Sequence, residues 1–467
     1  MQPRFIAVAV LETNRASVSD NTDVDIHLIE RALADMPGPR RILVGLSGGL
    51  DSIVLLCLVR QWWLTQAPAQ RPALHAIHVN HQLMPQADAW QARCVTLCAE
   101  WQVELTARKV VVESDQSSLE ASAREARYSV FKESVEPGDI LMLAHHRDDQ
   151  VETVLQRLAR GSGPLGLGGM ALHSRLHGFS LLRPLLDIDR EQLQAFASDH
   201  QLSWMEDPSN QDETLERNYI RHRLLPVWRD QRPQLNQSLA RSARLSQESA
   251  QLLDELAALD MRGQPQSDGG LPISILQELS CARQKNLLRY WLRQQGIRPP
   301  SEIVTQRILE EVLGASADGQ PQVAWGQSSV RRFQATLYGL ATVLPQPAGL
   351  QLRLDTFDSP QSLPLGCLIS GVGESCFSRQ AMEQAPVTVR FRSGGERLKL
   401  QGRPPKALKD LFQESGVPPW LRGVWPILYS GGSIAGLPGL WVCEGFLPQS
   451  EEDKICFHWH RNAVAQD

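Results

Sequence analysis

The chain of 467 residues has a formal net charge of −5, with 42% hydrophobic and 21% charged residues. This length predicts about three domains, and the composition is that of an ordinary globular protein. The slightly acidic balance argues against a protein that is basic over its whole surface, so any contact with nucleic acid has to be local. No apolar stretch approaches the roughly 20 residues that a membrane span requires. We therefore expect a cytoplasmic protein with no membrane partner.

The eight cysteines are scattered, and none forms the closely spaced pair that is typical of a zinc or redox site. We interpret them as mostly buried thiols in a reducing compartment. They are Cys57, Cys94, Cys98, Cys281, Cys367, Cys376, Cys443 and Cys456.

Strands and helices alternate along the first part of the chain. Strand-like apolar runs occupy residues 42–46, 74–79, 103–112 and 140–144, and helical patterns occupy 51–63, 87–101, 119–135 and 147–160. This alternation predicts an α/β domain with a parallel sheet and helices on both faces. A glycine-dense loop follows at 161–169, and two further helical patterns, 193–202 and 217–228, close the domain.

The rest of the chain changes character twice. Residues 237–261 carry leucines at helical spacing without glycine or proline, which predicts a small helical domain. Beyond residue 345, short apolar runs alternate with turn signals, which predicts an α+β or β-rich domain with one helix near 407–415. The expected parts are an N-terminal extension (1–22), a catalytic domain (23–227), a helical middle domain (228–345) and a C-terminal domain (346–467).

The strongest local signal is a glycine-containing turn between a buried strand and a helix. At such a junction the free backbone N–H groups of the first helical turn favour an anion, and glycines let the backbone approach it closely. No lysine follows at the position that a Walker-type loop would use. Asp51 stands in the turn instead, and a carboxylate beside phosphates needs a divalent cation, which we expect to be Mg²⁺. The alternative is a tight turn with an ordinary helix cap.

A second group of chemically active side chains lies at the start of a later helix. His145, Asp149 and Glu152 are spaced to share one helix face at the carboxyl end of the preceding strand, where open parallel sheets bind ligands. The two carboxylates suit a cation, and His145 could relay a proton or contact a phosphate. We expect Asp148 to face away and to cap the helix. The alternative is a solvated acidic helix face.

Two motifs resemble known families. Leu46-Ser47-Gly48-Gly49-Leu50-Asp51-Ser52 resembles the fingerprint of the PP-loop ATP-pyrophosphatases, whose members cleave ATP between its α- and β-phosphates to adenylate an oxygen. The run from Ala144 to Thr153, with the glycine-rich segment 161–169, resembles the lysidine synthetase family specifically. The matching motifs together span about residues 41–227.

The resemblance implies an adenine nucleotide alpha hydrolase-like fold and an enzyme that uses ATP and Mg²⁺. It implies that ATP adenylates the C2 oxygen of the wobble cytidine in a CAU-anticodon tRNA(Ile), and that the ε-amine of L-lysine then displaces AMP. The product, lysidine, changes decoding from AUG to AUA. It further implies a homodimer, with the lysine ammonium and the cytosine on the face that carries Asp149 and Glu152. The residues implied to bind ATP are Ser47, Gly48, Gly49, Leu50, Asp51, Ser52, Arg217 and Arg221; either arginine could instead pair with Glu213 or Glu216.

Contacts with RNA are expected from two groups of cations. Arg124 and Arg127 lie within the motif region, although Arg124 could pair with Glu120. A local excess of lysine and arginine between 390 and 422 predicts phosphate contacts, with Trp420 and Trp425 near enough for base stacking. The alternative is a solvated basic surface. The residues selected there are Arg397, Lys399, Lys406, Lys409 and Arg422.

Two other functions remain open at this level. A tRNA thiolase of the same superfamily would need a sulfur relay or an iron–sulfur cluster held by cysteines. A non-catalytic RNA-binding protein on an inactive PP-loop would have no use for a costly acidic cluster beside phosphate.

Overall fold

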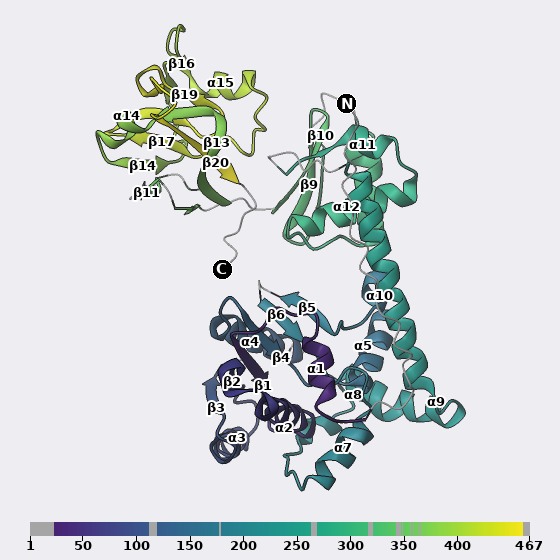
Figure 1. Ribbon diagram of the computed structural model, residues 1–467. Helices are drawn as coiled ribbons and strands as arrows, with labels where there is room; N and C mark the ends of the chain where they lie inside the picture. Colours follow the sequence, from purple (N-terminus) through teal and green to yellow (C-terminus); the bar gives the residue numbers. More distant parts are fainter. Residues whose placement is uncertain are drawn as a thin grey trace, which may run out of the picture. The chain divides into compact units, whose positions relative to one another are not determined.

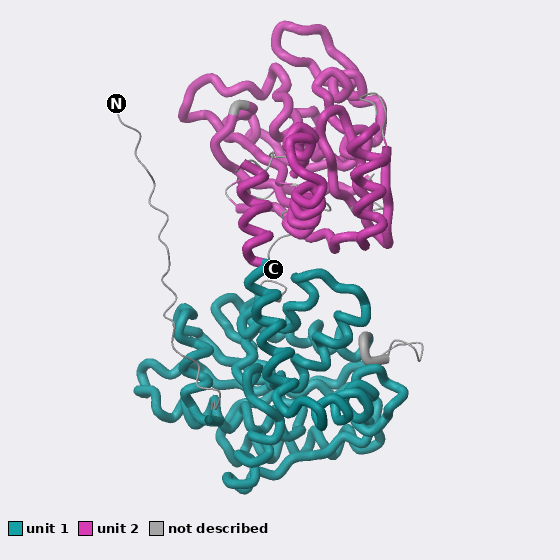
Figure 2. Tube along the Cα trace, turned by 90° about the vertical axis from the view of Figure 1, so that its right-hand side faces the viewer, with its two compact units in different colours: residues 1–250 teal, residues 251–467 magenta. Residues whose placement is uncertain are grey.

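The computed structural model describes residues 23–460 apart from 112–118, 177–178, 263–268, 316–320, 342–346, 348, 355, 358 and 364–365. The expected N-terminal extension lies outside the described residues. The chain forms two compact units, residues 1–250 and 251–467 (Figure 2). Within the described part, no helix has the length and apolar character needed to cross a membrane.

The first unit is built on a six-stranded sheet in the order β3-β2-β1-β4-β6-β5 (Figure 1). All neighbouring strands are parallel except β5, which pairs antiparallel with β6. The strands are β1 (Arg41–Gly45), β2 (Ala73–Asn80), β3 (Glu104–Lys109), β4 (Asp139–Met142), β5 (His173–Leu176) and β6 (Phe179–Leu182). The parallel α/β sheet predicted from the alternation is confirmed.

Helices cover both faces of this sheet because its strands are apolar on both sides. Ile42 and Val44 of β1 belong to the core beneath α2, whereas Leu43 belongs to the core beneath α4. The α2 helix is buried almost all round, which explains its lack of a polar face. The helices are α1 (His27–Leu33), α2 (Leu50–Thr65), α3 (Ala87–Trp101), α4 (Leu119–Ser134), α5 (Arg147–Ala159) and α7 (Arg190–Asp199).

After the sheet, the chain returns to the side of α5. The expected loop 161–169 contains one short helix, α6 (Pro164–Leu167). The expected helix 217–228 is confirmed as one continuous run, made of α8 (Glu216–Tyr219), a π-helical segment η4 (Ile220–Leu224) and α9 (Leu225–Gln231), because the residues at both junctions keep helical backbone angles. The long helix α10 (Leu235–Asp260) then crosses the point at which the chain divides into its two units. The domain bounds expected from the sequence stay a prediction.

The first part of the second unit combines helices with a sheet. Its helices are α11 (Ile273–Gln277), α12 (Cys281–Gln294), α13 (Glu302–Arg307) and the π-turn η5 (Ile308–Leu313). The expectation of a helical region is met, but it omits an antiparallel sheet in the order β7-β10-β9-β8. These strands are β7 (Leu271–Pro272), β8 (Gln322–Trp325), β9 (Ser328–Phe333) and β10 (Thr336–Ala341). The sequence did not reveal this sheet because short strands in glycine-rich and proline-rich segments give a weak periodic pattern of hydrophobic residues.

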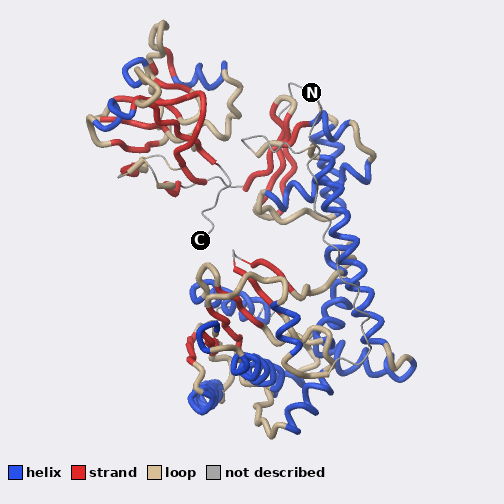
Figure 3. Tube along the Cα trace, in the orientation of Figure 1, coloured by secondary structure: helices blue, strands red, loops and turns tan. Residues whose placement is uncertain are grey.

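The last part of the chain is β-rich, as predicted, with α15 (Leu408–Glu414) at the expected place (Figure 3). Its sheets have the orders β11-β14-β17-β18-β19, β12-β13-β20 and β15-β16. The elements are β11 (Gln351–Leu354), β12 (Gln361–Leu363), β13 (Gly366–Ser378), α14 (Arg379–Glu383), β14 (Val387–Arg390), β15 (Arg397–Leu398), β16 (Lys406–Ala407), β17 (Ile427–Ser430), β18 (Ser433–Leu437), β19 (Trp441–Val442) and β20 (Lys454–His460).

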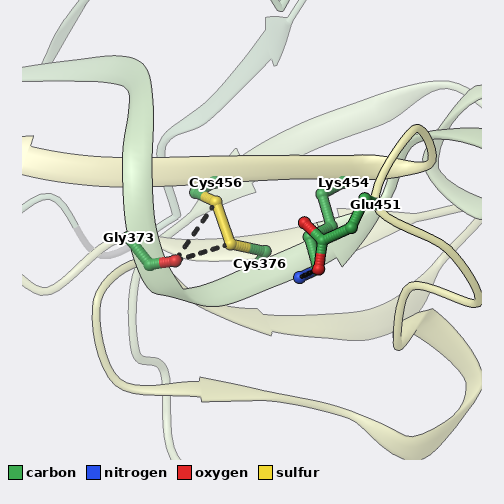
Figure 4. Close-up of a disulfide and its surroundings, with 5 residues drawn as sticks. All are labelled: Gly373, Cys376, Glu451, Lys454 and Cys456. Atoms are coloured by element: carbon green, nitrogen blue, oxygen red, sulfur yellow. Dashed lines mark hydrogen bonds and ion pairs between the residues drawn. A yellow bond between two sulfur atoms is a disulfide. The ribbon is translucent and has the colours of Figure 1, made fainter.

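Two cysteines of this region form a disulfide, which corrects the expectation that the thiols are unpaired. Cys376 on β13 and Cys456 on β20 face each other in the strand register, with their Cα atoms 4.1 Å apart (Figure 4). Spacing along the chain could not reveal this pair, because 80 residues separate the two positions. Of the other six cysteines, only Cys281 is exposed.

A buried carboxylate anchors the start of an interior strand of the first sheet. Asp139, at the start of β4, has a fully buried side chain that accepts hydrogen bonds from Arg41 (Nη2–Oδ2 2.6 Å) and Arg40 (Nη2–Oδ1 3.1 Å). Burial alone would raise the pKa of this carboxyl, but the Arg41 hydrogen bond and the backbone N–H of Glu136 hold it below its usual value.

We predict that Asp139→Asn lowers the free energy of local opening by about 1–3 kcal/mol, because hydrogen bonds to a charged group are lost. Since the folded pKa is depressed, this stabilisation is present above the unfolded pKa of about 3.9 and is lost as the pH falls through the folded value. Native-state hydrogen exchange at the amides of β1 and β4 measures the effect. The control is Glu136→Gln, an exposed partner of Arg40, which should cost less than about 1 kcal/mol. Equal losses in the two variants would contradict the prediction.

Candidate functional site

The loop between β1 and α2 is organised around one hydroxyl. The Oγ of Ser52 accepts hydrogen bonds from the backbone N–H groups of Ser47 and Gly48, both at 3.2 Å, and donates to the carbonyl of Gly49 at 3.0 Å. Leu50, which begins α2, is buried in the core and fixes the helix against the sheet. The loop is therefore shaped by its own side chains, with backbone N–H groups gathered at a helix start.

The two glycines of this loop differ in their backbone conformation and in the space around them. Gly48 has φ +89°, and an added Cβ would lie 2.2 Å from Cε of Met205, whose N–H bonds the Gly48 carbonyl. Gly49 has an ordinary φ of −79°, and its added Cβ would find no atom closer than 3.6 Å. The fold of the chain thus requires glycine at 48. At 49 the chain leaves room above the backbone, as close approach by a ligand would need.

Asp51 lies in the first turn of α2 and points toward the second group of residues. Its Oδ2 is 3.7 Å from Nε2 of His146, and its Oδ1 is buried without a hydrogen-bond partner. Burial raises the pKa of the Asp51 carboxyl, and the nearby His146 opposes this effect. An unpartnered carboxylate oxygen at a phosphate loop fits Mg²⁺, which typically takes one or two protein carboxylates together with phosphates and water. The described residues contain no cluster of three or more ligands that could hold a metal without a substrate.

The acidic pair on α5 is neutralised by two arginines. Nε of Arg217 lies 2.6 Å from Glu152 and its Nη2 lies 2.6 Å from Asp149, while Nε of Arg221 lies 2.6 Å from the other Glu152 oxygen. The Glu152 side chain is 0% exposed, so these contacts balance a fully buried charge. The structure brings both arginines to the acidic pair, and their expected contact with ATP stays a prediction. Their expected alternative partners are engaged elsewhere, Glu213 with Arg223 and Glu216 with Arg160.

His145 lies beside this acidic pair. Burial lowers the pKa of its imidazole to about 3, against the opposing charge of Asp149 and with the help of Arg183 and Arg217. The ring is therefore neutral at neutral pH, and its Nδ1 is buried without a partner. Hence an uncharged imidazole lies near the ion-paired carboxylate of Asp149.

The sequence interpretation missed His146, which connects the loop to the acidic pair. Its Nε2 lies 3.7 Å from Asp51 and 3.5 Å from Asp149, and its Nδ1 lies 3.6 Å from Asp148. Burial would lower its pKa, but the surrounding carboxylates outweigh burial and raise the pKa to about 9. The available signal was its place directly after the strand end, one residue nearer the helix than His145.

The expected cap of α5 is also corrected. The carboxylate that accepts the backbone N–H of His146, at 3.0 Å, belongs to Asp149 and not to Asp148. A side chain three residues into a helix reaches back to the N-cap in this way. Asp148 accepts instead from the backbone N–H of Arg190 and from the side chain of Arg229.

The two arginines expected to contact RNA in this unit are exposed on α4. The guanidinium of Arg124 lies over the ring of Tyr128, 5.0 Å from its centroid. The side chain of Glu120, its expected alternative partner, lies outside the described residues. Burial lowers the pKa of the His81 imidazole to about 4, and the positive charge of Arg127 contributes to this shift.

The cations selected in the second unit have mostly intramolecular partners. Lys399 pairs with Glu444 at 2.8 Å, and Lys406 pairs with Glu414. Arg397 donates to the carbonyl of Pro405 at 2.7 Å, Arg422 donates to that of Val417 at 2.9 Å, and Lys409 is exposed.

The expectation that the two tryptophans stack on bases is not supported by their packing. Trp420 makes edge-to-face contacts with Phe333 on β9 and Tyr338 on β10, which lie much earlier in the sequence. Trp425 packs against Phe412 and Trp459, and both tryptophans border the same apolar core. Each ring thus already has aromatic neighbours within the fold, and stacking on bases stays a prediction.

We predict that Gly48→Ala destabilises the substrate-free loop by about 1–3 kcal/mol, because a side chain at positive φ is strained and the Met205 methyl must move. Gly49→Ala is the matched control and should stay within about 0.5 kcal/mol of the parent. Thermal unfolding and hydrogen exchange of the substrate-free protein measure both. Similar stability of the two variants would show that Gly48 is not conformationally required.

Comparisons with known proteins identify the family of the chain. Residues 23–228 match the PP-loop domain family, residues 271–338 the TilS substrate binding domain and residues 387–459 the TilS substrate C-terminal domain. The tRNA(Ile)-lysidine synthase of Serratia proteamaculans is 40% identical over 428 residues, covering 90% of this chain and 96% of the relative. That of Escherichia coli O157:H7 is 39% identical over 425 residues, covering 91% and 97%. A solved TilS C-terminal domain matches 24% of this chain and 98% of its own, with 23% identity and a TM-score of 0.20. With this identity over nearly the full length of these relatives, the chain belongs to the tRNA(Ile)-lysidine synthase family.

Proposed function

We propose that the protein ligates lysine to C2 of the wobble cytidine in CAU-anticodon tRNA(Ile) at the expense of ATP. The observation that carries the proposal is the junction of the phosphate loop with the acidic face of α5. There Asp51 and Asp149 both approach Nε2 of His146, at 3.7 Å and 3.5 Å. A nucleotide on the loop would thus lie next to a site that attracts a cation.

The reaction divides into two steps. First, the C2 oxygen of cytosine attacks the α-phosphorus of ATP, and diphosphate leaves from residues 47–52. A Mg²⁺ ion held by Asp51, when bound, would neutralise charge on the phosphates. Second, the lysine ε-amine attacks C2 and AMP departs with the C2 oxygen. Asp149 and Glu152 would hold and orient the lysine, neutral His145 would contact the attacking amine by a hydrogen bond, and the proton that the amine loses would pass to solvent.

The tRNA is proposed to contact the basic surface of the second unit and the arginines of α4. Beside Lys406 and Arg403 lies a cavity of about 370 Å³, with an apolar floor that includes Leu398 and Leu411. Cations at the rim of such a hollow suit an RNA backbone. We further propose a cytoplasmic homodimer; the location follows from the tRNA substrate, and the dimer rests on the family alone.

Neither alternative function gains support from the described residues. A thiolase would need reactive cysteines, but Cys94 and Cys98 lie in the core, where burial raises the pKa of their thiols to about 12 and about 11. A non-catalytic RNA-binding protein would not need the buried carboxylate of Glu152 beside a phosphate loop.

The proposed reaction is tested with ATP, Mg²⁺, radiolabelled lysine and a CAU-anticodon tRNA transcript. We expect label in the RNA that depends on both ATP and Mg²⁺, and a loss of about 10²- to 10³-fold in Asp51→Ala, because charge on the phosphates is no longer balanced. Asp199→Ala, an exposed residue at the end of α7, is the control and should retain activity. Diphosphate release without transfer of lysine would rule out this substrate and return attention to the thiolase.

The basic surface is tested by the salt dependence of tRNA binding. In Lys399→Gln/Lys409→Gln we expect weaker binding, and a slope of log K against log salt that is shallower by about two, one for each lost phosphate contact. Lys454→Gln is the control, since this lysine lies in the same part of the chain but pairs with Glu451 outside the basic surface. An unchanged slope in the double variant would exclude these two lysines from the RNA contact.

A further inference from the structure

One cation already occupies the acidic pair that is proposed to bind the substrate lysine. The guanidinium of Arg217 spans the pair, with Nε 2.6 Å from Glu152 and Nη2 2.6 Å from Asp149. The Glu152 side chain is fully buried and that of Asp149 is 14% exposed, so this contact is largely shielded from water. An alkyl-ammonium group would present the same charge and the same kind of donors to these oxygens.

The neighbouring arginine is placed differently. Arg221 makes a two-point contact with Glu152 alone, at 2.6 Å and 3.0 Å, and its distance to Asp149 is 3.7 Å. Of these two arginines, only Arg217 therefore bridges both carboxylates at hydrogen-bond distance.

We propose that Arg217 is an internal stand-in for the substrate ammonium, which leaves the Asp149–Glu152 pair when nucleotide binds and so opens the lysine site. The inference rests on the proposed function and extends it by making lysine binding depend on nucleotide. Triphosphate oxygens compete well for a guanidinium, which pairs with phosphate through parallel hydrogen bonds. Arg221 keeps its two-point contact with Glu152, so the buried carboxylate remains neutralised after Arg217 has left.

The local backbone is suited to such a movement. Arg217 and Arg221 lie on one helical run, in which α8 leads directly into the π-helical segment η4. Single π-helical turns within helices occur frequently at functional sites. A change of rotamer can carry the long Arg217 side chain off the acidic pair without moving the helix.

The consequence is a measurable coupling between two ligands. When the competent form of a site is only partly populated, the apparent affinity falls in proportion to that population. If the form with Arg217 on the acidic pair predominates by about ten to one, nucleotide should tighten lysine binding about tenfold.

Equilibrium dialysis of labelled lysine with the full chain tests this coupling, with and without Mg²⁺ and an ATP analogue that carries a methylene between its α- and β-phosphorus atoms. In the parent protein we expect the analogue to tighten lysine binding about tenfold. Arg217→Gln should bind lysine tightly without the analogue and lose the response to it, whereas Arg217→Lys should retain the response because it keeps the competing charge. Arg223→Gln removes an exposed arginine of the same segment, which pairs with Glu213, and should behave as the parent.

A folded Arg217→Gln variant that binds lysine no more tightly than the parent in the absence of the analogue would overturn the inference. If this variant does not fold, as judged by its thermal unfolding, the parent alone decides, because an analogue without effect on lysine affinity also overturns it. Failure of the proposed function looks different: the parent would then form no lysidine on tRNA. A parent that forms lysidine, with a negative result for Arg217→Gln, removes only the stand-in role.

Discussion

The site depends on the neutralisation of one buried carboxylate. Glu152 is 0% exposed, and a carboxylate at this depth is strongly destabilising unless cations and hydrogen bonds surround it. Arg217 and Arg221 supply both, and they come from a segment about 65 residues further along the chain. The ion pairs therefore fasten the α8–η4 segment to α5. Without these ion pairs, the carboxylates of α5 at the carboxyl ends of the strands would lack the cations that neutralise them.

His146 extends this charge balance to the phosphate loop. Three carboxylates lie within 3.7 Å of its ring nitrogens, and together they outweigh the effect of burial and keep the imidazole protonated at neutral pH. A cation at this point offsets the repulsion between Asp51 and Asp149. The loop after β1 and the helix after β4 are thus held together across adjacent strands of a parallel sheet, where such sheets bind ligands.

The sequence predicted those features that depend on local pattern. The alternation of strands and helices, the loop with Asp51 and the carboxylates of α5 all follow from spacing or from a short motif. The features that it missed depend on which distant segments meet. The disulfide of Cys376 and Cys456 arises from strand register, and the aromatic partners of Trp420 come from β9 and β10. The cap of α5 is the side chain that reaches back to the backbone N–H of His146. The sequence alone does not show whether Asp148 or Asp149 makes this contact.

Cations that are already paired with carboxylates of the same chain also occur away from the proposed reaction centre. Lys399 and Lys406, like Arg217 and Arg221, already contact carboxylates of the same chain. A cation that exchanges one anionic partner for another undergoes less net change in solvation than a bare cation that must be desolvated. Such internal pairing of cations with carboxylates is also compatible with a chain whose net charge is −5. Because the exposed pairs of the second unit are weak in water, RNA phosphates can replace their carboxylates readily. The buried pairs of the first unit hold more firmly, so the proposed opening of a lysine site would require a competitor as strong as a nucleotide.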